Sequence, residues 1–195
     1  MSIAEYIAAF VAIMIGLALA DLATSLQRLL RSGRRVKWDI LTPASAVLAT
    51  AFIINVWWAM FGALNALRTI SVGAFVPELV ALLLLFSLAS SALPDEVGPD
   101  GVDLASYYRD NQRWFWGLFT LYIVWVTAVI AARGLASELP AGALARAVVP
   151  NLVLASLTVT LAIARRRWIH VLLILALLAV TGLAWLPQEL AGTAK

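Results

Sequence analysis

This chain of 195 residues contains no cysteine and a single histidine, His170. The absence of cysteine excludes disulfides, thiolate metal sites and cysteine nucleophiles. One histidine cannot supply a multi-histidine metal centre or bis-histidine haem ligation. We therefore predict no metal site and no cofactor, and we expect His170 to lie at a membrane interface, near lipid phosphates.

Charged residues are scarce as well. They make up 13% of the chain, whereas hydrophobic residues make up 63% and the mean hydropathy is +0.94. Soluble domains contain roughly 25% charged and 45–50% apolar residues, so this composition excludes a soluble fold. The formal net charge of +3 is too small to favour nucleic acid as a partner. The expected partner is the lipid bilayer.

Catalytic motifs are also missing from the sequence. It contains neither H-E-x-x-H nor G-x-S-x-G, and its only lysines, Lys37 and Lys195, lie outside the apolar segments. We assign no catalytic residue and predict that the protein is not an enzyme. The alternative is an enzyme acting on lipids, for which the carboxylates between residues 95 and 110 would have to converge.

What the chain does contain is a series of long apolar segments. Each bilayer crossing needs roughly 20 mostly apolar residues, and six such segments nearly use up the chain. We expect an all-α integral membrane bundle of six transmembrane helices, a single domain over residues 1–195. The expected spans are residues 3–20 with an extension to 31, 43–67, 74–93, 114–132, 147–164 and 168–186.

Two connections stand out between these spans. Residues 94–113 are polar and are broken by proline and glycine, so we expect them to form a cytoplasmic loop. Only three arginines, residues 165–167, separate the last two spans. We therefore expect these two helices to form a tight antiparallel hairpin.

The basic residues predict the orientation of the bundle, because connections rich in Lys and Arg are retained on the cytoplasmic side. One side of the predicted bundle carries ten of the 14 basic residues, and the other carries four. The ten are Arg28, Arg31, Arg34, Arg35, Lys37, Arg109, Arg113, Arg165, Arg166 and Arg167. Both termini are therefore expected on the non-cytoplasmic side of a bacterial inner (plasma) membrane.

Small residues recur at every fourth position of the first helix. They form an expected helix-packing face of Ala8, Ala12, Gly16 and Ala20. Small residues at this spacing let another helix approach closely, which is how helices associate in lipid. The face fits packing within the chain, and it also fits an interface in a homo-oligomer or a larger membrane complex.

Four polar residues are candidates for a transport pathway: Glu5, Asp21, Asn55 and Glu78. Ionisable groups inside a membrane bundle are costly and tend to mark ion or proton routes. Three of the four residues also have a structural interpretation. Asp21 fits a solvated or paired acid at the membrane surface, Glu78 fits a carboxylate at the start of a helix, and Asn55 fits a hydrogen bond between helices.

The clustered arginines fit a role at the membrane surface. Arg34 and Arg35 follow the first span, and Arg165, Arg166 and Arg167 follow the fifth. Basic residues in such positions set topology and attract anionic lipids. We therefore expect these five side chains to contact lipid headgroups.

Several short stretches together resemble a known group of proteins. They are Gly16–Asp21, Trp38–Asp39, Trp57–Trp58, Leu93–Glu96, Tyr107–Tyr108 and Arg113–Phe115. Over about its first two thirds the chain resembles a group of small, functionally uncharacterised multi-pass proteins of the bacterial inner membrane. The resemblance implies a bacterial plasma membrane, and it carries over no function.

The sequence leaves two hypotheses about function. The first is a small ion or proton channel or transporter, acting alone or as a homo-oligomer. The second is a non-catalytic accessory or scaffold subunit that packs against a larger membrane complex through the first helix. A water-filled path or a lipid-sized cavity bounded by Asp21 and Asn55 would favour the first hypothesis, and its absence would favour the second.

Overall fold

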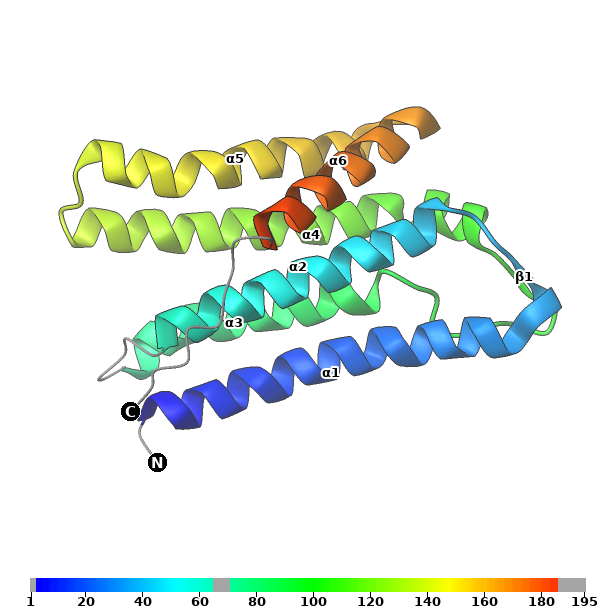
Figure 1. Cartoon of the computed structure of the whole chain (residues 1–195), viewed down its shortest axis with the longest axis horizontal. Coiled ribbons are helices and arrows are strands. Elements are labelled where there is room, and N and C mark those ends of the chain that lie inside the picture. The colour runs from blue at the N-terminus through cyan, green and yellow to red at the C-terminus, as the bar shows by residue number, and fades with distance from the viewer. Residues whose placement is uncertain (1–2, 65–70, 186–195) are drawn as a thin grey trace.

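The computed structural model describes residues 3–64 and 71–185, and it confirms the predicted all-α class (Figure 1). Five of the six helices in this part of the chain are long and apolar enough to span a membrane; α6 is a shorter apolar helix. The helices are α1 (Ile3–Ser32), α2 (Leu41–Leu64), α3 (Val72–Ser90), α4 (Leu104–Ala136), α5 (Ala141–Ile163) and α6 (Arg167–Trp185).

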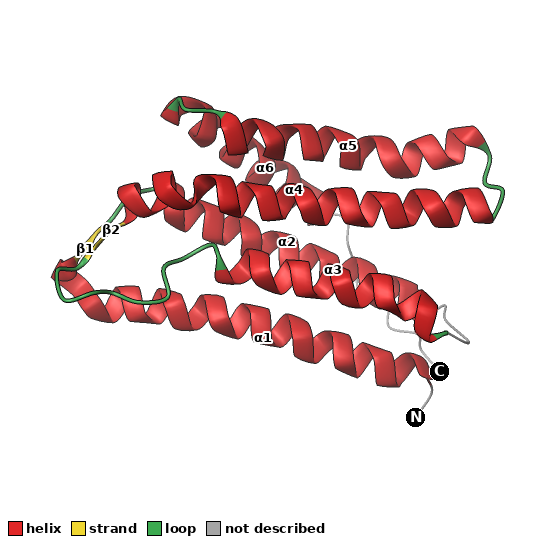
Figure 2. Cartoon of the chain, turned by 180° about the vertical axis from the view of Figure 1, so that it is seen from behind, coloured by secondary structure: helices red, strands yellow, loops and turns green. Residues whose placement is uncertain are grey.

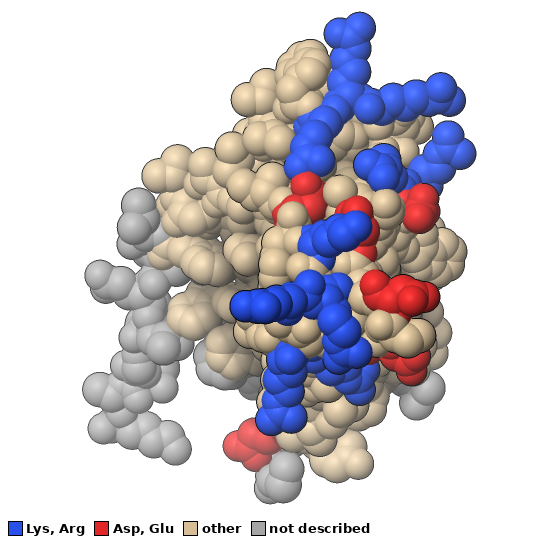
Figure 3. Space-filling model, turned by 90° about the vertical axis from the view of Figure 1, so that its right-hand side faces the viewer, with Lys and Arg blue, Asp and Glu red and all other residues tan. Residues whose placement is uncertain are grey.

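The helices run alternately up and down an elongated bundle (Figure 1). α1 lies along one edge against α2 and α3, and α5 lies along the opposite edge against α4. Most Lys and Arg side chains gather at one end of the bundle, which faces the viewer in Figure 3. We call it the arginine-rich end; it comprises the end of α1, the connections 33–40 and 91–103, and the turn 164–166.

The surface along the helices is largely apolar. Large side chains such as Leu83, Leu121 and Leu172 are half or more exposed. In water this exposed area would cost about 25 cal/mol per Å², whereas lipid tails solvate it without that cost. This surface is what helices that face lipid require.

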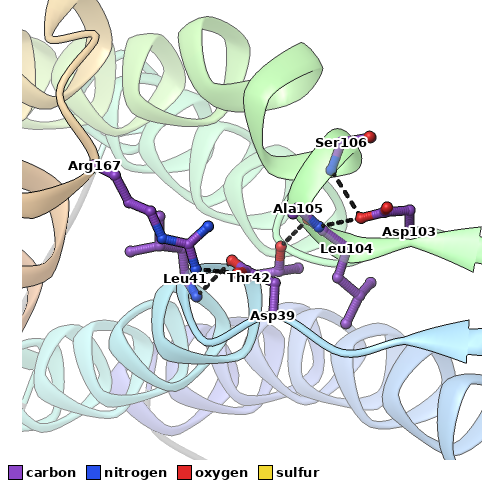
Figure 4. Close-up of polar contacts among 8 residues, drawn as sticks. All are labelled: Asp39, Leu41, Thr42, Asp103, Leu104, Ala105, Ser106 and Arg167. Carbon is purple, nitrogen blue, oxygen red and sulfur yellow. Dashed lines mark hydrogen bonds and ion pairs between the residues drawn. The ribbon is translucent and has the colours of Figure 1, made fainter.

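The helix α4 begins ten residues earlier than predicted, so the expected loop 94–113 is corrected to residues 91–103. Asp103 caps the helix, because its Oδ1 accepts from the backbone N–H of Ala105 at 2.9 Å and of Ser106 at 3.2 Å (Figure 4). The first turns are amphipathic: Leu104 and Tyr108 are buried. The residues on the outer face of these turns are polar, so their composition is like that of a loop.

Two short strands join the connections at the arginine-rich end. β1 (Val36–Lys37) pairs in parallel with β2 (Val102–Asp103), and the two lie side by side in Figure 2. Gly101, next to β2, has φ +89° and lies against the carbonyl oxygen of Arg35. Any side chain here would meet that oxygen, so glycine is required for the close approach of the two connections.

Hydrogen bonds also fix the starts of the helices to one another. Asp39 Oδ2 accepts from the N–H of Leu41 at 3.1 Å, so α2 begins two residues before the predicted position 43. The hydroxyl of Thr42 is buried and donates to the carbonyl of Leu104 at 2.8 Å (Figure 4). Asp39 also forms an ion pair with Arg167 of α6. The starts of α2, α4 and α6 therefore form one unit.

The helix α6 does not form the predicted hairpin with α5. Residues 164–166 join the two helices, but α6 packs mainly against α2 and diverges from α5 (Figure 1). Its buried residues His170, Ile174 and Leu177 recur at helical spacing. The short connection brings the helix ends together, whereas this buried face sets the direction of α6.

Replacing Gly101 by alanine tests the contact between the two connections. We expect Gly101→Ala to destabilise the protein by about 1–3 kcal/mol, because a Cβ would lie 2.2 Å from the Arg35 oxygen and the backbone has positive φ. The measurement is the thermal unfolding midpoint in detergent. Gly98→Ala is the control, since a Cβ there meets nothing within 4 Å. Equal midpoints for both variants would contradict the structure.

Candidate solute cavity

A cavity of about 300 Å³ lies where α2, α3, α4 and α5 meet. Its walls are mainly apolar, with side chains such as Val56, Leu82 and Leu154. Each helix also contributes one polar side chain: Asn55, Glu78, Tyr122 and Asn151 respectively. A concave, mostly apolar site with a few convergent polar groups is the usual form of a small-molecule pocket.

Three of these polar groups have no hydrogen-bond partner in the part of the chain that the structure describes. In residues 3–64 and 71–185, no hydrogen bond is formed by the side chains of Asn55, Tyr122 or Asn151. These residues lie near the middle of their helices. Because an unpaired polar group in apolar surroundings costs a few kcal/mol, such groups need water or a solute as partner. The cavity provides the space for one.

Glu78 brings a carboxylate to the cavity wall. It lies in the second turn of α3 and accepts from Arg133 Nη1 at 2.7 Å. Its expected role at the helix start is corrected, because Ser71 caps α3 by accepting from the N–H of Ala74 at 3.2 Å. Arg133 is in the last turn of α4, so this ion pair lies between the cavity and the end opposite the arginine-rich end.

The position of Glu78 is fixed by the contact of α3 with α4. The indole N–H of Trp125 donates to the carbonyl of Pro77 at 2.9 Å. The second guanidinium nitrogen of Arg133 also donates to the carbonyl of Ala74 at 3.2 Å. Two side chains of α4 therefore hold the first turns of α3, and the carboxylate stays beside the cavity.

Aromatic side chains close the cavity on its other side. The ring of Phe52 contacts those of Tyr122 and Phe119, with centroids 5.3 Å and 4.6 Å apart. Phe115 and Trp116 continue this packing toward the arginine-rich end. Trp116 and Phe119 are almost fully buried. The cavity is thus separated from the arginine-rich end by an aromatic core.

The four predicted pathway residues do not come together. Asn55 and Glu78 line the cavity, whereas Asp21 lies near the arginine-rich end and accepts from the hydroxyl of Ser90 at 2.6 Å. Glu5 is exposed near the opposite end of α1. The structure therefore joins only two of the four residues in one site.

Sequence analysis did not single out Tyr122 and Asn151 as site residues. Asn151 follows Pro150 within an otherwise apolar stretch of α5, and this isolated polar residue was the available signal. Tyr122 gave no such signal, because tyrosine is common in buried cores. Tyr122 lines the cavity because of how α4 is oriented against α2, and the sequence does not show that orientation.

The small-residue face of α1 points away from the bundle. Ala12, Gly16 and Ala20 are exposed, Ala8 is half-buried, and a Cβ built on Gly16 meets nothing within 4 Å. The stripe that packs into the bundle is instead Val11, Ile15, Ala18, Leu22, Ser25 and Leu29. In the described residues, Ala8 alone of this face packs against the core, and Ala12, Gly16 and Ala20 stay exposed.

The basic clusters and His170 lie at the arginine-rich end. The side chains of Arg34, Arg35 and Arg166 are exposed. His170 is 2% exposed and bonded to Tyr108, so its expected position at an interface near lipid phosphates is corrected to a buried one. The carboxylates of the connection stay exposed, and in the described residues no three of His, Asp and Glu approach as metal ligands would.

Comparisons of the chain with protein-family models, with curated proteins and with solved structures found no match. The resemblance to small proteins of the bacterial inner membrane therefore stays a prediction.

Cysteine labelling can test whether the cavity contains water, because the chain has no cysteine of its own. We expect Asn55→Cys to react with a small water-soluble thiosulfonate about tenfold faster or more than Ile54→Cys, because only a thiolate in contact with water reacts. Ile54 is the matched control, since its exposed side chain lies on the apolar outside of α2. Equal rates would mean that water does not enter the cavity.

Proposed function

We propose that the protein is a small multi-pass membrane carrier for an ion, a proton or a small polar solute, which binds in the cavity between α2 and α5. The proposal includes a bacterial inner membrane, six crossings and both termini on the non-cytoplasmic side. The single observation that carries it is the set of unpaired polar side chains, Asn55, Tyr122 and Asn151, facing one cavity beside Glu78.

The depth of these groups supports this proposal. Asn151 is the eleventh residue of α5, so it lies about 15 Å along the axis from the start of that helix. In a hydrocarbon core of about 30 Å, that depth is near the midplane. Polar groups at this depth are costly unless they face a water-filled cavity or a substrate. Transporters commonly bind their substrates near the midplane.

The aromatic core supports a carrier rather than an open pore. Phe52, Phe119 and Tyr122 pack together between the cavity and the arginine-rich end. These rings therefore block direct passage of a solute from the cavity to the arginine-rich end. Transport across the membrane would need these rings to move apart. The cavity would at the same time have to close at the Glu78 end, as alternating access requires.

Flux measurements in proteoliposomes test this function. Protein in vesicles should carry protons, Na⁺, K⁺ or Cl⁻ above the rate of empty vesicles, as followed with ion-sensitive dyes. Asn151→Leu should lower that rate on the order of tenfold, since one lost hydrogen bond in a buried site costs roughly 1–3 kcal/mol. Ser156→Leu is the control on the exposed side of the same helix. The absence of flux of all four ions from the unchanged protein would refute transport of these ions.

A second function is favoured by the outer face of α1. Ala12, Gly16 and Ala20 are exposed side by side along a helix at the edge of the bundle. Small residues at four-residue spacing allow close helix contact in lipid. The alternative proposal is therefore a scaffold subunit that binds a larger membrane complex, or a second copy, through this face.

Mild extraction from native membranes distinguishes this alternative. A scaffold should migrate as a large complex on native gels, and Gly16→Leu should dissociate it, because the longer side chain keeps the partner helix at a distance. Leu17→Ala is the control, since Leu17 is exposed on the neighbouring face of α1. A single monomeric species from the unchanged membranes would count against the scaffold.

A further inference from the structure

A second, smaller cavity of about 150 Å³ lies at the arginine-rich end, away from the solute cavity. It forms where the start of α2, the first turns of α4 and the turn between α5 and α6 meet. The side chains that define it are Asp39, Arg109, Gln112, Arg165, Arg167 and His170. We call it the arginine pocket.

The arginine pocket has an excess of positive charge. Three guanidinium groups and one carboxylate leave a formal balance of two positive charges. Both oxygens of Asp39 are already bonded, one to Arg167 and the other to the N–H of Leu41 (Figure 4). Arg165 has no bonded partner in residues 3–64 and 71–185. The pocket therefore has an unpaired cation, and its carboxylate is already neutralised.

The inner wall of the pocket is held by a chain of hydrogen bonds. Trp116 Nε1 donates to the hydroxyl of Tyr108 at 3.0 Å, and this hydroxyl is 2.7 Å from His170 Nδ1. His170 Nε2 faces the carbonyl oxygen of Ala164 at 3.0 Å. A carbonyl can only accept, so Nε2 carries a proton, and in the neutral ring Nδ1 accepts from the tyrosine. These buried rings give the pocket a rigid base.

The turn that carries Arg165 is fixed in the same way. The side-chain amide of Gln112 donates to the carbonyls of Leu161 at 2.9 Å and Ala164 at 2.8 Å. These carbonyls belong to the end of α5, where no helical N–H can reach them. One side chain of α4 therefore holds the end of α5, and this places Arg165, whose side chain is exposed, along the same pocket as Arg109 and Arg167.

The start of α6 adds to the positive potential. α6 begins at Arg167, and the first N–H groups of a helix have no partner within it. The helix dipole makes this end favourable for an anion. Arginine is also the side chain that best fits a phosphate, since its planar fork donates two parallel hydrogen bonds.

We propose that the arginine pocket binds a phosphate group, from the headgroup of an anionic membrane lipid or from free phosphate. Its volume is below the roughly 300–1,000 Å³ of pockets for drug-sized ligands, and it suits one small anionic group. Nearby in the chain, the side chains of Ile163 at the end of α5 and of Trp168 and Leu172 in α6 are exposed on the apolar surface. An acyl chain could lie along them while its phosphate occupies the pocket.

The test uses the full-length protein in detergent and two probes. Inorganic phosphate is titrated by calorimetry, and phosphatidylglycerol is counted by native mass spectrometry beside phosphatidylcholine, which has no net charge. Binding of phosphatidylglycerol alone identifies the lipid as the source. Binding of inorganic phosphate identifies a site for the free anion. Absence of both overturns the proposal.

Matched variants separate this site from general attraction between charges. Arg109→Gln with Arg165→Gln removes two positive charges from the pocket, and Arg34→Gln with Arg35→Gln removes two from an exposed turn at the same end. We expect the pocket pair to weaken binding by about tenfold or more and the control pair by much less. Equal loss in both pairs would overturn the proposal. Arg165→Gln alone, in a turn where Arg165 has no described partner, provides the same test if the pair fails to fold.

Discussion

The satisfaction of buried polar groups at the arginine-rich end is the constraint on which the rest of this structure depends. Helix ends leave backbone groups without partners, and in apolar surroundings these groups must find partners in neighbouring segments. Thr42 bonds the start of α4, Gln112 bonds the end of α5, and Asp39 bonds both its own helix and α6. The helices are thereby fixed to one another at this end, and their packing follows from there.

The opposite half of the bundle is joined differently. Its described links between helices include the ion pair of Glu78 with Arg133 and the bond from Trp125 to Pro77, both between α3 and α4. Asn55 and Asn151 stay unbonded within the described chain. In the proposed carrier, polar groups without a bond in the described residues are the ones available to a solute. The arginine-rich end is thus held by hydrogen bonds between helices, whereas the cavity keeps polar groups that a solute can bind.

Aromatic side chains connect the two proposed sites. Rings follow one another from His170 and Tyr108 through Trp116 and Phe119 to Phe52, with Tyr122 at the cavity wall. Such packed rings exclude water. They separate the arginine pocket from the solute cavity, and any rearrangement that opens the cavity toward the arginine-rich end must also move the base of the pocket.

Sequence alone was sufficient for the all-α class and for the approximate extent of most helices, because length and apolarity are local properties. It located Asn55 and Glu78 as isolated polar residues, but it could not show that they share a cavity with Tyr122 and Asn151. It placed the start of α4 too late, since the amphipathic turn at Leu104 and Tyr108 has the composition of a loop. The direction of α6, the burial of His170 and the outward face at Gly16 were decided only by the tertiary structure. The physical reason is that these features depend on which helices pack together, and contacts between distant segments leave no local pattern in the chain.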